Sequence, residues 1–440
     1  MFKSNILKWL KLSISVTILE MFKRFRHFLT SVRVGWFLAI RQLRRSSKWT
    51  TVLITFVMTL TFLNLVVVTG ILVGLIEGSS RAFRAQYSGD VLIISNEDKD
   101  YIERSTDFIN RAKSLPQVES LTARYLKGGT VEANYQTKSR ETDVVDNTGS
   151  NITGINPTME NQTTNLKSLL VEGEYLTDQD FDKVLVGSRL LAKYFTGPEF
   201  LSLSNVGLGD KIRIKVNGQT REVTIKGIVK SKIDDVGGRV YFVDSQLRGM
   251  LGRTDYNVGE IAIKLKPNVD PLAVKAILQQ GGLGEFAKVQ TWQESQGEFF
   301  RQISNTFQLL GNFLGSISLV VASITIFIVI FVNAITRRKY IGIMKGIGIS
   351  SQAIEISYIL QSIFYAVVGS AVGLVILYAG LQPFVAAHPI NFPFSDGILV
   401  APLGGTMIRV LLLLITTVIA GFIPARMIIR RNTLDAILGR

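Results

Sequence analysis

The residue types that usually carry out chemistry in proteins are scarce in this sequence of 440 residues. It contains no cysteine, which excludes thiol catalysis, thiolate metal sites and disulfides. Its only histidines, His27 and His388, do not make a histidine-rich metal site, and we expect no metal to be bound. The dipeptide Gly-Lys never occurs, so there is no phosphate-binding P-loop. The adjacent acids Asp234 and Asp235 are more typical of a solvated turn than of a catalytic pair. We therefore expect no catalytic residue.

The most distinctive short segment runs from Arg337 to Ser350 and reads RRKYIGIMKGIGIS. Its three glycines would let the backbone of another protein approach closely, and its isoleucines would form an apolar face. Ser350 could cap the helix that follows. An ordinary basic loop at a membrane surface explains the same residues, and the physical argument alone favours neither docking nor a simple connection.

Long apolar stretches flank that segment and indicate an integral membrane protein. Hydrophobic residues make up 47% of the chain and charged residues only 19%, with a mean hydropathy of +0.29. A helix needs about 20 apolar residues to cross a bilayer. Windows with almost no charge predict four spanning helices, and Pro383 predicts that the third ends near Gln382, before an outer loop at 382–402. The predicted spans are 50–76, 309–335, 356–381 and 403–425.

The uneven distribution of charge predicts how these helices are oriented. Residues 1–49 carry a net charge of +10, whereas residues 77–301 are almost neutral. Basic residues are in excess on the cytoplasmic side of membrane helices. We therefore expect a multi-pass protein of the cell (plasma or inner) membrane, with the N-terminus, the 336–355 loop and the 426–440 tail in the cytoplasm. No nucleic acid is expected as a partner, because the basic residues flank apolar spans instead of forming a separate domain.

The first 49 residues mix aromatic and basic side chains, which is typical of an amphipathic helix lying in the membrane interface. A cleavable signal is not expected, because the candidate core Leu12 to Leu19 is short and contains hydroxyl residues. A mobile tail over residues 1–30 is the alternative. The bases predicted to meet anionic lipid at the membrane surface are Lys23, Arg24, Arg26, Arg41, Arg44 and Arg45.

Residues 77–301 predict a folded α+β domain outside the membrane. Short β-rich runs alternate with turn signals, and Asn217-Gly218 predicts a hairpin between strands at Lys211–Val216 and Glu222–Val229. The Asn- and Thr-rich region 136–168 predicts strands joined by a mobile loop. Helices are predicted at about 101–114, 188–196 and 271–280.

Several motifs spread over about residues 32–440 resemble those of the MacB/LolC/FtsX-like ABC transporter permeases of the type VII, mechanotransmission class. Their order along the chain also resembles that of the family. The segment 337–350 resembles the signature R-R-x-E-I-G-I-x-K-A-I-G-x-S, with Tyr340 in place of Glu and Gly346 in place of Ala. Ile423-Pro-Ala-Arg426 followed by Thr433 to Leu438 resembles the ending of the family, with Thr433 in place of Pro. Similar pieces of the outer domain are Gly154–Pro157, Leu170–Gly173, Val184–Ala192 and Gly209–Ile212.

This resemblance implies an α-helical membrane protein with four transmembrane helices and a large extracytoplasmic α+β domain, a MacB-like periplasmic core domain, between helices 1 and 2. It implies a non-catalytic permease subunit that binds no cofactor itself. The partners would be a second permease chain, in a homo- or heterodimer, and an ABC ATP-binding subunit that holds ATP and Mg. The residues implied in coupling to the ATPase are Arg337, Arg338, Gly342, Ile343, Lys345, Gly346, Ile347, Gly348 and Ser350.

The family also limits the function. ATP hydrolysis would move the outer domain and drive export or extraction of a peptide, drug, lipid or lipoprotein, with a periplasmic adaptor as a further candidate partner. The alternative is an FtsX-like signalling scaffold that activates a cell-wall hydrolase without transport. Gly369 and Gly373 lie four residues apart in the third helix and predict close helix packing, either between two chains or within one.

Overall fold

The computed structural model describes residues 26, 28–137, 146–194, 202–392 and 396–429. The predicted membrane-surface bases Lys23 and Arg24, and the C-terminal motif from Thr433 to Leu438, lie outside these residues. The chain divides into two compact units, which we call the helical unit and the sheet unit. The helical unit comprises residues 1–74, 306–390 and 398–440, and the sheet unit comprises residues 75–305 and 391–397.

Four helices of the described residues are long and apolar enough to cross a membrane. They are α2 (Lys48–Phe83), α9 (Gly297–Thr336), α11 (Ser351–Val375) and α13 (Leu403–Ile429). In the helical unit they share one core, which includes Phe62 of α2, Ile326 of α9 and Tyr365 of α11. Large apolar side chains such as Phe313 and Ile324 point outward, as lipid-facing positions require.

The third apolar helix differs from the prediction that it ends near Gln382. A π-helical turn, η7 (Ile376–Leu381), follows α11 and leads directly into α12 (Gln382–Ala387). Pro383 follows this π-helical turn as the second residue of α12, and the helical conformation continues past it to Ala387.

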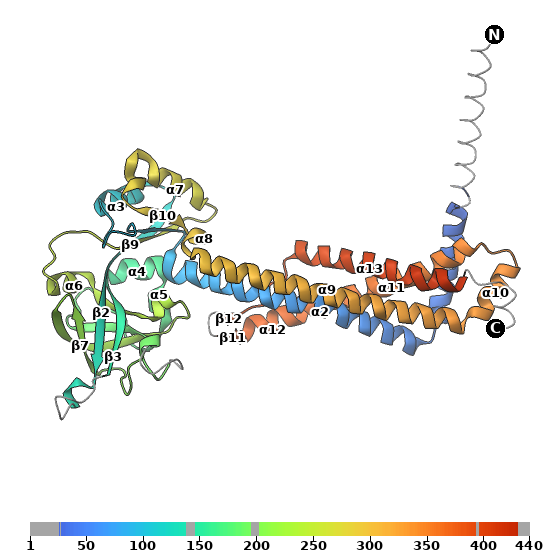
Figure 1. Cartoon of the computed structure of the whole chain (residues 1–440), viewed down its shortest axis with the longest axis horizontal. Coiled ribbons are helices and arrows are strands. Elements are labelled where there is room, and N and C mark those ends of the chain that lie inside the picture. The colour runs from blue at the N-terminus through green and yellow to red at the C-terminus, as the bar shows by residue number, and fades with distance from the viewer. Residues whose placement is uncertain (1–25, 27, 138–145, 195–201, 393–395, 430–440) are drawn as a thin grey trace, which may run out of the picture. The chain divides into compact units, whose positions relative to one another are not determined.

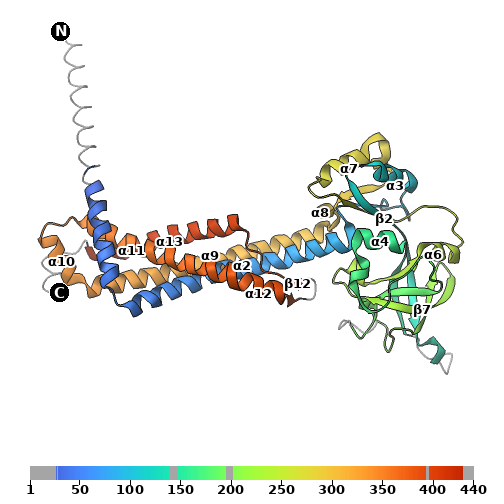
Figure 2. The same cartoon turned by 180° about the vertical axis from the view of Figure 1, so that it is seen from behind.

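A helix over residues 28–45 runs across the end of the bundle where α10 (Arg338–Gly346) also lies, as Figure 1 and Figure 2 show. One face of this helix packs on the start of α11. The hydroxyl groups of Ser31 and Ser350 are 3.1 Å apart, and Gln361 Nε2 donates a hydrogen bond of 2.5 Å to Gln42 Oε1. Trp36 lies on the opposite, exposed face, so this described part of the N-terminal segment is amphipathic.

The described strands β1–β10 of the sheet unit form one ten-stranded sheet in the order β10-β1-β9-β2-β3-β8-β5-β7-β4, with β6 paired to both β2 and β7. The strands are β1 (Val91–Ile94), β2 (Val118–Ala133), β3 (Asp146–Ile155), β4 (Leu170–Gly173), β5 (Lys183–Gly187), β6 (Lys211–Val216), β7 (Gln219–Val229), β8 (Arg239–Val243), β9 (Glu260–Leu265) and β10 (Lys288–Thr291). The α-helices are α3 (Ser105–Ser114), α4 (Pro157–Thr164), α5 (Asp234–Gly237), α6 (Asp244–Met250), α7 (Pro271–Gln279) and α8 (Trp292–Ser295).

The long strand β2 belongs to two lobes of this sheet. Its first half pairs with β9, next to which β1 and β10 follow, and α3 and α7 lie together on this lobe (Figure 1). Its second half pairs with β3 and β6. In this second lobe the pairings β2-β3-β8-β5-β7-β6 return to β2, so the six strands close around an apolar core that includes Ile152, Ile214 and Val240. A closed ring leaves few strand edges unpaired.

The predicted hairpin is confirmed, whereas one predicted helix is wrong. Asn217 and Gly218 both have positive φ, +48° and +77°, and join the paired strands β6 and β7. The helix predicted at 188–196 is a single 3-10 turn, Ser188–Leu190, followed by a bridge from Leu191 to Leu203. Leu190 and Leu191 are both buried, and consecutive buried residues fit this packing better than one face of a surface helix. Residues 195–201 lie outside the described residues.

Candidate functional site

Helix α10 is a short amphipathic helix between two apolar ones. It begins two residues after α9 ends at Thr336, and α11 begins five residues after it ends. Ile341 is 2% exposed and belongs to the shared core of the helical unit, whereas Ile343 is 46% and Ile347 is 72% exposed. The isoleucines therefore do not form one continuous apolar face. Ile341 and Ile349 pack against the core of the helical unit and anchor the segment. Ile343 and Ile347, together with Tyr340, are exposed and remain available for a partner.

The glycines of this segment have different structural roles. Gly348 has a φ of +91° and ends α10, with its N–H donating to the carbonyl of Lys345 at 3.0 Å. The N–H of Ile349 donates to the carbonyl of Met344 at 3.0 Å, which completes a Schellman motif. Gly348 is thus needed by the fold of the chain itself. Gly346 is helical, and a Cβ atom added there would meet nothing within 4 Å. Gly342 is buried.

The polar residues predicted for coupling are also partly engaged within the chain. Ser350 caps α11, accepting a hydrogen bond of 3.3 Å from the N–H of Ala353. Lys345 donates through Nζ to the carbonyl oxygen of Ile429 at the end of α13. Arg338 is exposed. These contacts hold α10 at a defined place in the helical unit.

Arg337, between α9 and α10, lines a pocket of about 490 Å³ together with Arg41 and Arg45 of the helix over residues 28–45. One predicted coupling residue, Arg337, and two predicted membrane-surface residues, Arg41 and Arg45, thus line the same pocket. Arg26 and Arg44 are exposed and do not line this pocket.

Gly369 and Gly373 of α11 lie against α2 within the same chain. A Cβ atom on Gly369 would lie 2.6 Å from Cβ of Met58, and one on Gly373 would lie 2.3 Å from Cδ1 of Phe62. Met58 and Phe62 are one helical turn apart, so the two glycines form a groove for one face of α2. A larger residue at either position would have to push the helices apart.

A buried cluster of charged residues, which we call the ionic cluster, lies in the sheet unit and was not anticipated from the sequence. Arg124 of β2 is 2% exposed, and its guanidinium contacts two carboxylates, Glu160 of α4 at 2.7 Å and Glu260 of β9 at 3.1 Å. Arg239 of β8 donates to Glu260 at 2.8 and 3.0 Å. Tyr87 of η1 (Arg84–Ser88) donates its hydroxyl to Glu260 at 2.7 Å. The sequence does not reveal this cluster, because its members are far apart along the chain and no local pattern marks them.

The charges of the ionic cluster stabilise one another. Burial alone would raise the pKa of Glu260, but the nearby guanidinium of Arg239, its hydrogen bonds and the charge of Arg124 outweigh burial and lower that pKa to about 2. Burial likewise opposes ionisation of Glu160, yet Arg124 and the hydroxyl groups of Thr164 and Thr122 lower its pKa. Both carboxylates are therefore ionised at neutral pH, paired with two buried arginines.

The end of the first apolar helix joins this cluster. Arg124 Nη2 donates to the carbonyl oxygen of Tyr87 at 2.9 Å, so that residue is held through both backbone and side chain. Arg84 forms an ion pair with Asp90, whose other carboxylate oxygen accepts from the N–H of Leu265 at 2.7 Å. The turn η1 is thus attached to β1 and β9 at several points.

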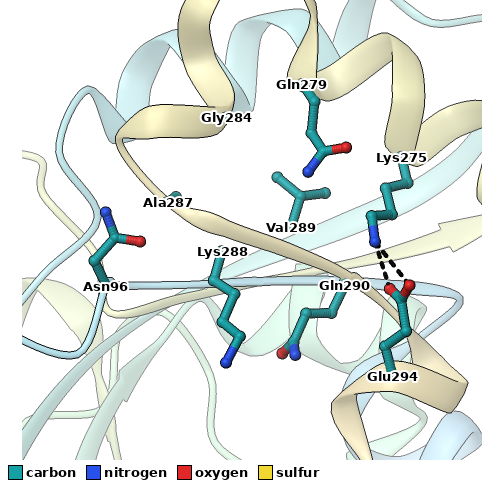
Figure 3. A pocket seen from close by; sticks show the side chains of 9 residues that line it. All are labelled: Asn96, Lys275, Gln279, Gly284, Ala287, Lys288, Val289, Gln290 and Glu294. Atoms are coloured by element: carbon teal, nitrogen blue, oxygen red, sulfur yellow. Dashed lines mark hydrogen bonds and ion pairs between the residues drawn. The ribbon is translucent and has the colours of Figure 1, made fainter.

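A second pocket, of about 440 Å³, lies in the sheet unit (Figure 3). Figure 3 shows amide side chains of Asn96, Gln279 and Gln290 around it, with Lys275 reaching to Glu294. Lys275 Nζ lies 2.7 Å from both carboxylate oxygens of Glu294, which also forms a capping box with Thr291. This carboxylate is fixed by structural contacts, and the arrangement does not resemble a catalytic site.

The described residues contain no group of three or more His, Asp or Glu side chains placed to hold a metal ion. The adjacent acids considered above begin α5, where Asp234 pairs with Arg189 and Asp235 lies 3.6 Å from Arg239. Asp235 therefore borders the ionic cluster.

Two family models match successive parts of the chain. Residues 55–281 match the MacB-like periplasmic core domain, and residues 312–433 match the FtsX-like permease C-terminal domain. These matches and the four apolar helices define a membrane-protein class with a periplasmic-type α+β domain and a short helix at the bundle end. The chain belongs to the MacB/FtsX-like family of ABC transporter permeases.

Curated relatives agree with this family. The macrolide export ATP-binding/permease protein MacB of Haemophilus ducreyi is 28% identical over 191 residues, which cover 41% of this chain and 25% of that protein. The ABC transporter permease YtrF of Bacillus subtilis is 27% identical over 199 residues, covering 42% of this chain and 43% of YtrF. The matched regions thus span less than half the length of either relative.

Two solved structures show a fainter likeness. The periplasmic region of MacB from Actinobacillus actinomycetemcomitans is 16% identical with a TM-score of 0.34, covering 48% of this chain and 93% of that one. The extracellular domain of the transporter YknZ from Gram-positive bacteria is 15% identical with a TM-score of 0.30, covering 46% of this chain and 99% of that one. Scores this low carry no argument.

Proposed function

We propose that this chain is the permease subunit of an ABC transporter, driven by a separate ATP-binding subunit that holds ATP and Mg on the cytoplasmic side. The observation that carries this proposal is α10, a short helix anchored through Ile341 with Ile343 and Ile347 exposed. Apolar side chains on a short helix at the end of a bundle suit docking to a partner protein. The relatives named as ATP-binding/permease proteins support an ATPase as that partner.

The outer domain would be moved through the helices that enter it. Helix α2 runs without interruption from Lys48 to Phe83 and continues as η1 to Ser88. Helix α9 begins at Gly297, close in sequence to β10 and α8. We propose that displacement of α2 reaches strands β2 and β9 through Tyr87 and the ionic cluster. Rigid elements joined by buried contacts transmit small shifts better than mobile loops do.

The substrate would then be exported or extracted outside the membrane, and its class is a peptide, drug, lipid or lipoprotein. The related MacB proteins are named for macrolide export, which supports transport over signalling. Loss of export on inactivating the ATPase is the expected result. A change in cell-wall cleavage with export intact would support the FtsX-like scaffold instead.

The docking role of α10 can be tested at Gly346, which is better suited than Gly348 because its backbone needs no positive φ. Gly346→Trp should reduce co-purification of the ATP-binding subunit by about tenfold or more, since steric overlap typically costs 1–3 kcal/mol. The matched control is Gly249→Trp on α6, another helical glycine with nothing within 4 Å of an added Cβ. Unchanged co-purification in both variants would mean that α10 is a simple connector.

A further inference from the structure

The pocket between the helix over residues 28–45 and α10 combines positive charge with apolar walls, and we call it the arginine pocket. Three guanidinium groups line it, those of Arg41, Arg45 and Arg337. Leu38, Ile343 and Met344 provide apolar surface beside them. A pocket of this composition suits a ligand that is anionic at one end and apolar at the other.

The positive charge of the arginine pocket is not neutralised within the described part of the chain. No acidic residue lines the pocket, and none of its three arginines forms an ion pair with a described residue. The guanidinium carbon of Arg41 lies 6.0 Å from the centroid of the Phe37 ring. A guanidinium offers paired N–H donors that match a phosphate, so three of them together favour a phosphate group as ligand.

A second, independent feature points to a polar ligand. Tyr358 of α11 also lines the arginine pocket, is 1% exposed, and its hydroxyl has no hydrogen-bond partner among the described residues. A buried hydroxyl without a partner is costly, typically 1–3 kcal/mol. A ligand oxygen in the pocket would satisfy it.

The position of the pocket favours a lipid over a soluble phosphate. Arg337 directly follows the last residue of α9, and Arg45 lies three residues before α2 begins at Lys48. The pocket therefore lies at the ends of two apolar helices, which is where lipid headgroups would surround a membrane-spanning bundle. Trp36 is 58% and Phe37 is 60% exposed on the neighbouring helix, as is typical of residues at a membrane interface.

We propose that the arginine pocket binds the headgroup phosphate of an anionic phospholipid from the leaflet that α10 faces, with an acyl chain along Leu38 and Met344. Bound there, the lipid would hold the helix over residues 28–45 against α10. Basic pockets between membrane helices bind anionic headgroups in this way. The site depends on pocket geometry alone and stands whether or not α10 docks an ATPase.

The test is native mass spectrometry of the full chain in detergent, titrated with phosphatidylglycerol or with phosphatidylcholine. The wild-type chain should prefer phosphatidylglycerol. Arg41→Gln/Arg45→Gln should lower that preference by about 10- to 30-fold, because each basic residue near anionic lipid contributes roughly a factor of five. The control Arg33→Gln/Arg44→Gln removes the same charge from exposed positions of the same helix outside the pocket and should change it by less than about threefold.

Tyr358→Phe and Arg337→Gln provide further tests that do not depend on the double variant folding. Tyr358→Phe should weaken phosphatidylglycerol binding by about fivefold without lowering the melting temperature of the lipid-free chain, since the hydroxyl has no partner there. Arg337→Gln should weaken it by a similar factor. Size-exclusion profiles matching that of the wild-type chain would show that the variants are folded.

Four results would overturn the proposal. Equal losses in the two double variants would mean diffuse surface attraction. Displacement of phosphatidylglycerol by millimolar inorganic phosphate would mean a free-anion site. Equal binding of the two lipids by the wild-type chain would exclude headgroup recognition. Unchanged lipid preference in the pocket variants, together with loss of the ATP-binding subunit, would assign the arginines to a protein partner.

Discussion

The hydroxyl of Tyr87 donates a 2.7 Å hydrogen bond to the carboxylate of Glu260, joining the end of a helix to a strand 173 positions later in the chain. Glu260 also accepts from Arg124 and Arg239, so one carboxylate connects η1, β2, β8 and β9. The guanidinium groups of both arginines also lie over the ring of Tyr87, at 5.2 and 5.1 Å. The strands of the sheet unit are thus attached to η1 through Tyr87, whose hydroxyl and ring both contact the same charged groups.

The contribution of the Tyr87 hydroxyl can be isolated, because its ring packing survives in Tyr87→Phe. We expect this variant to lose about 1.5–3 kcal/mol of local stability, the usual value of a hydrogen bond to a charged group. Amide hydrogen exchange of peptides from β9 and η1, followed by mass spectrometry, would measure it. Tyr256→Phe is the control, since Tyr256 is 81% exposed. Equal exchange in both variants would show that the bond does not hold η1 to the sheet.

The low pKa of Glu260 predicts how the stability of the sheet unit changes at acid pH. Its folded-state pKa of about 2 lies below the ordinary 4.5, so ionised Glu260 stabilises the fold above pH 4.5, and that stability is lost as pH falls toward 2. The loss should amount to about 3 kcal/mol for this group. In Glu260→Gln the stability at neutral pH should be lower and its fall between pH 5 and 2.5 smaller.

Scanning calorimetry of the full chain across this pH range would measure the effect on the sheet unit. Part of the acid dependence should remain in Glu260→Gln, because Glu160 also has a lowered pKa. Glu119→Gln, an exposed carboxylate paired with Lys264, is the control and should behave like the wild type. An unchanged pH profile in Glu260→Gln would contradict the stabilising role of the charge.

The packing of α11 on α2 predicts that Gly373 cannot be enlarged. Gly373→Leu should destabilise the helical unit by about 1–3 kcal/mol, because its Cβ atom would overlap the ring of Phe62. Thermal denaturation in detergent would measure the loss. Gly380→Leu is matched in size and hydrophobicity, but its Cβ atom would meet nothing within 4 Å, so it should be nearly neutral. Loss of dimerisation with unchanged stability would instead assign Gly373 to an interface between chains.

The predicted orientation in the membrane can be tested on this cysteine-free chain. Thr220→Cys lies at the exposed start of β7 in the sheet unit, and Ile347→Cys lies at the exposed end of α10. In intact cells an impermeant maleimide should label Thr220→Cys alone, and Ile347→Cys should react only after lysis. Both positions avoid the turn residue Asn217 and the helix-end residues Gly348 and Ser350. The reverse pattern would show that the orientation derived from charge is wrong.

The sequence by itself determined the features that local patterns encode. The apolar windows located four long helices, and the hairpin at Asn217-Gly218 followed from the positive φ that these residues tolerate. Strand β6 was predicted with its observed bounds, since alternating apolar residues mark it directly. The order of short motifs indicated the family, which the family models confirmed.

Only the tertiary structure decided which residues meet. Arg124 and Glu260 are 136 positions apart, and neither stands in a pattern that distinguishes a buried charge from a solvated one. The isoleucines of the segment 337–350 looked equivalent in the sequence, but packing buries Ile341 and leaves Ile347 exposed. Arg41 and Arg337 were assigned to separate roles and line one pocket. The local periodicity of a sequence indicates which face of a helix or strand is apolar. Which distant residues come into contact depends on how whole helices and strands pack together.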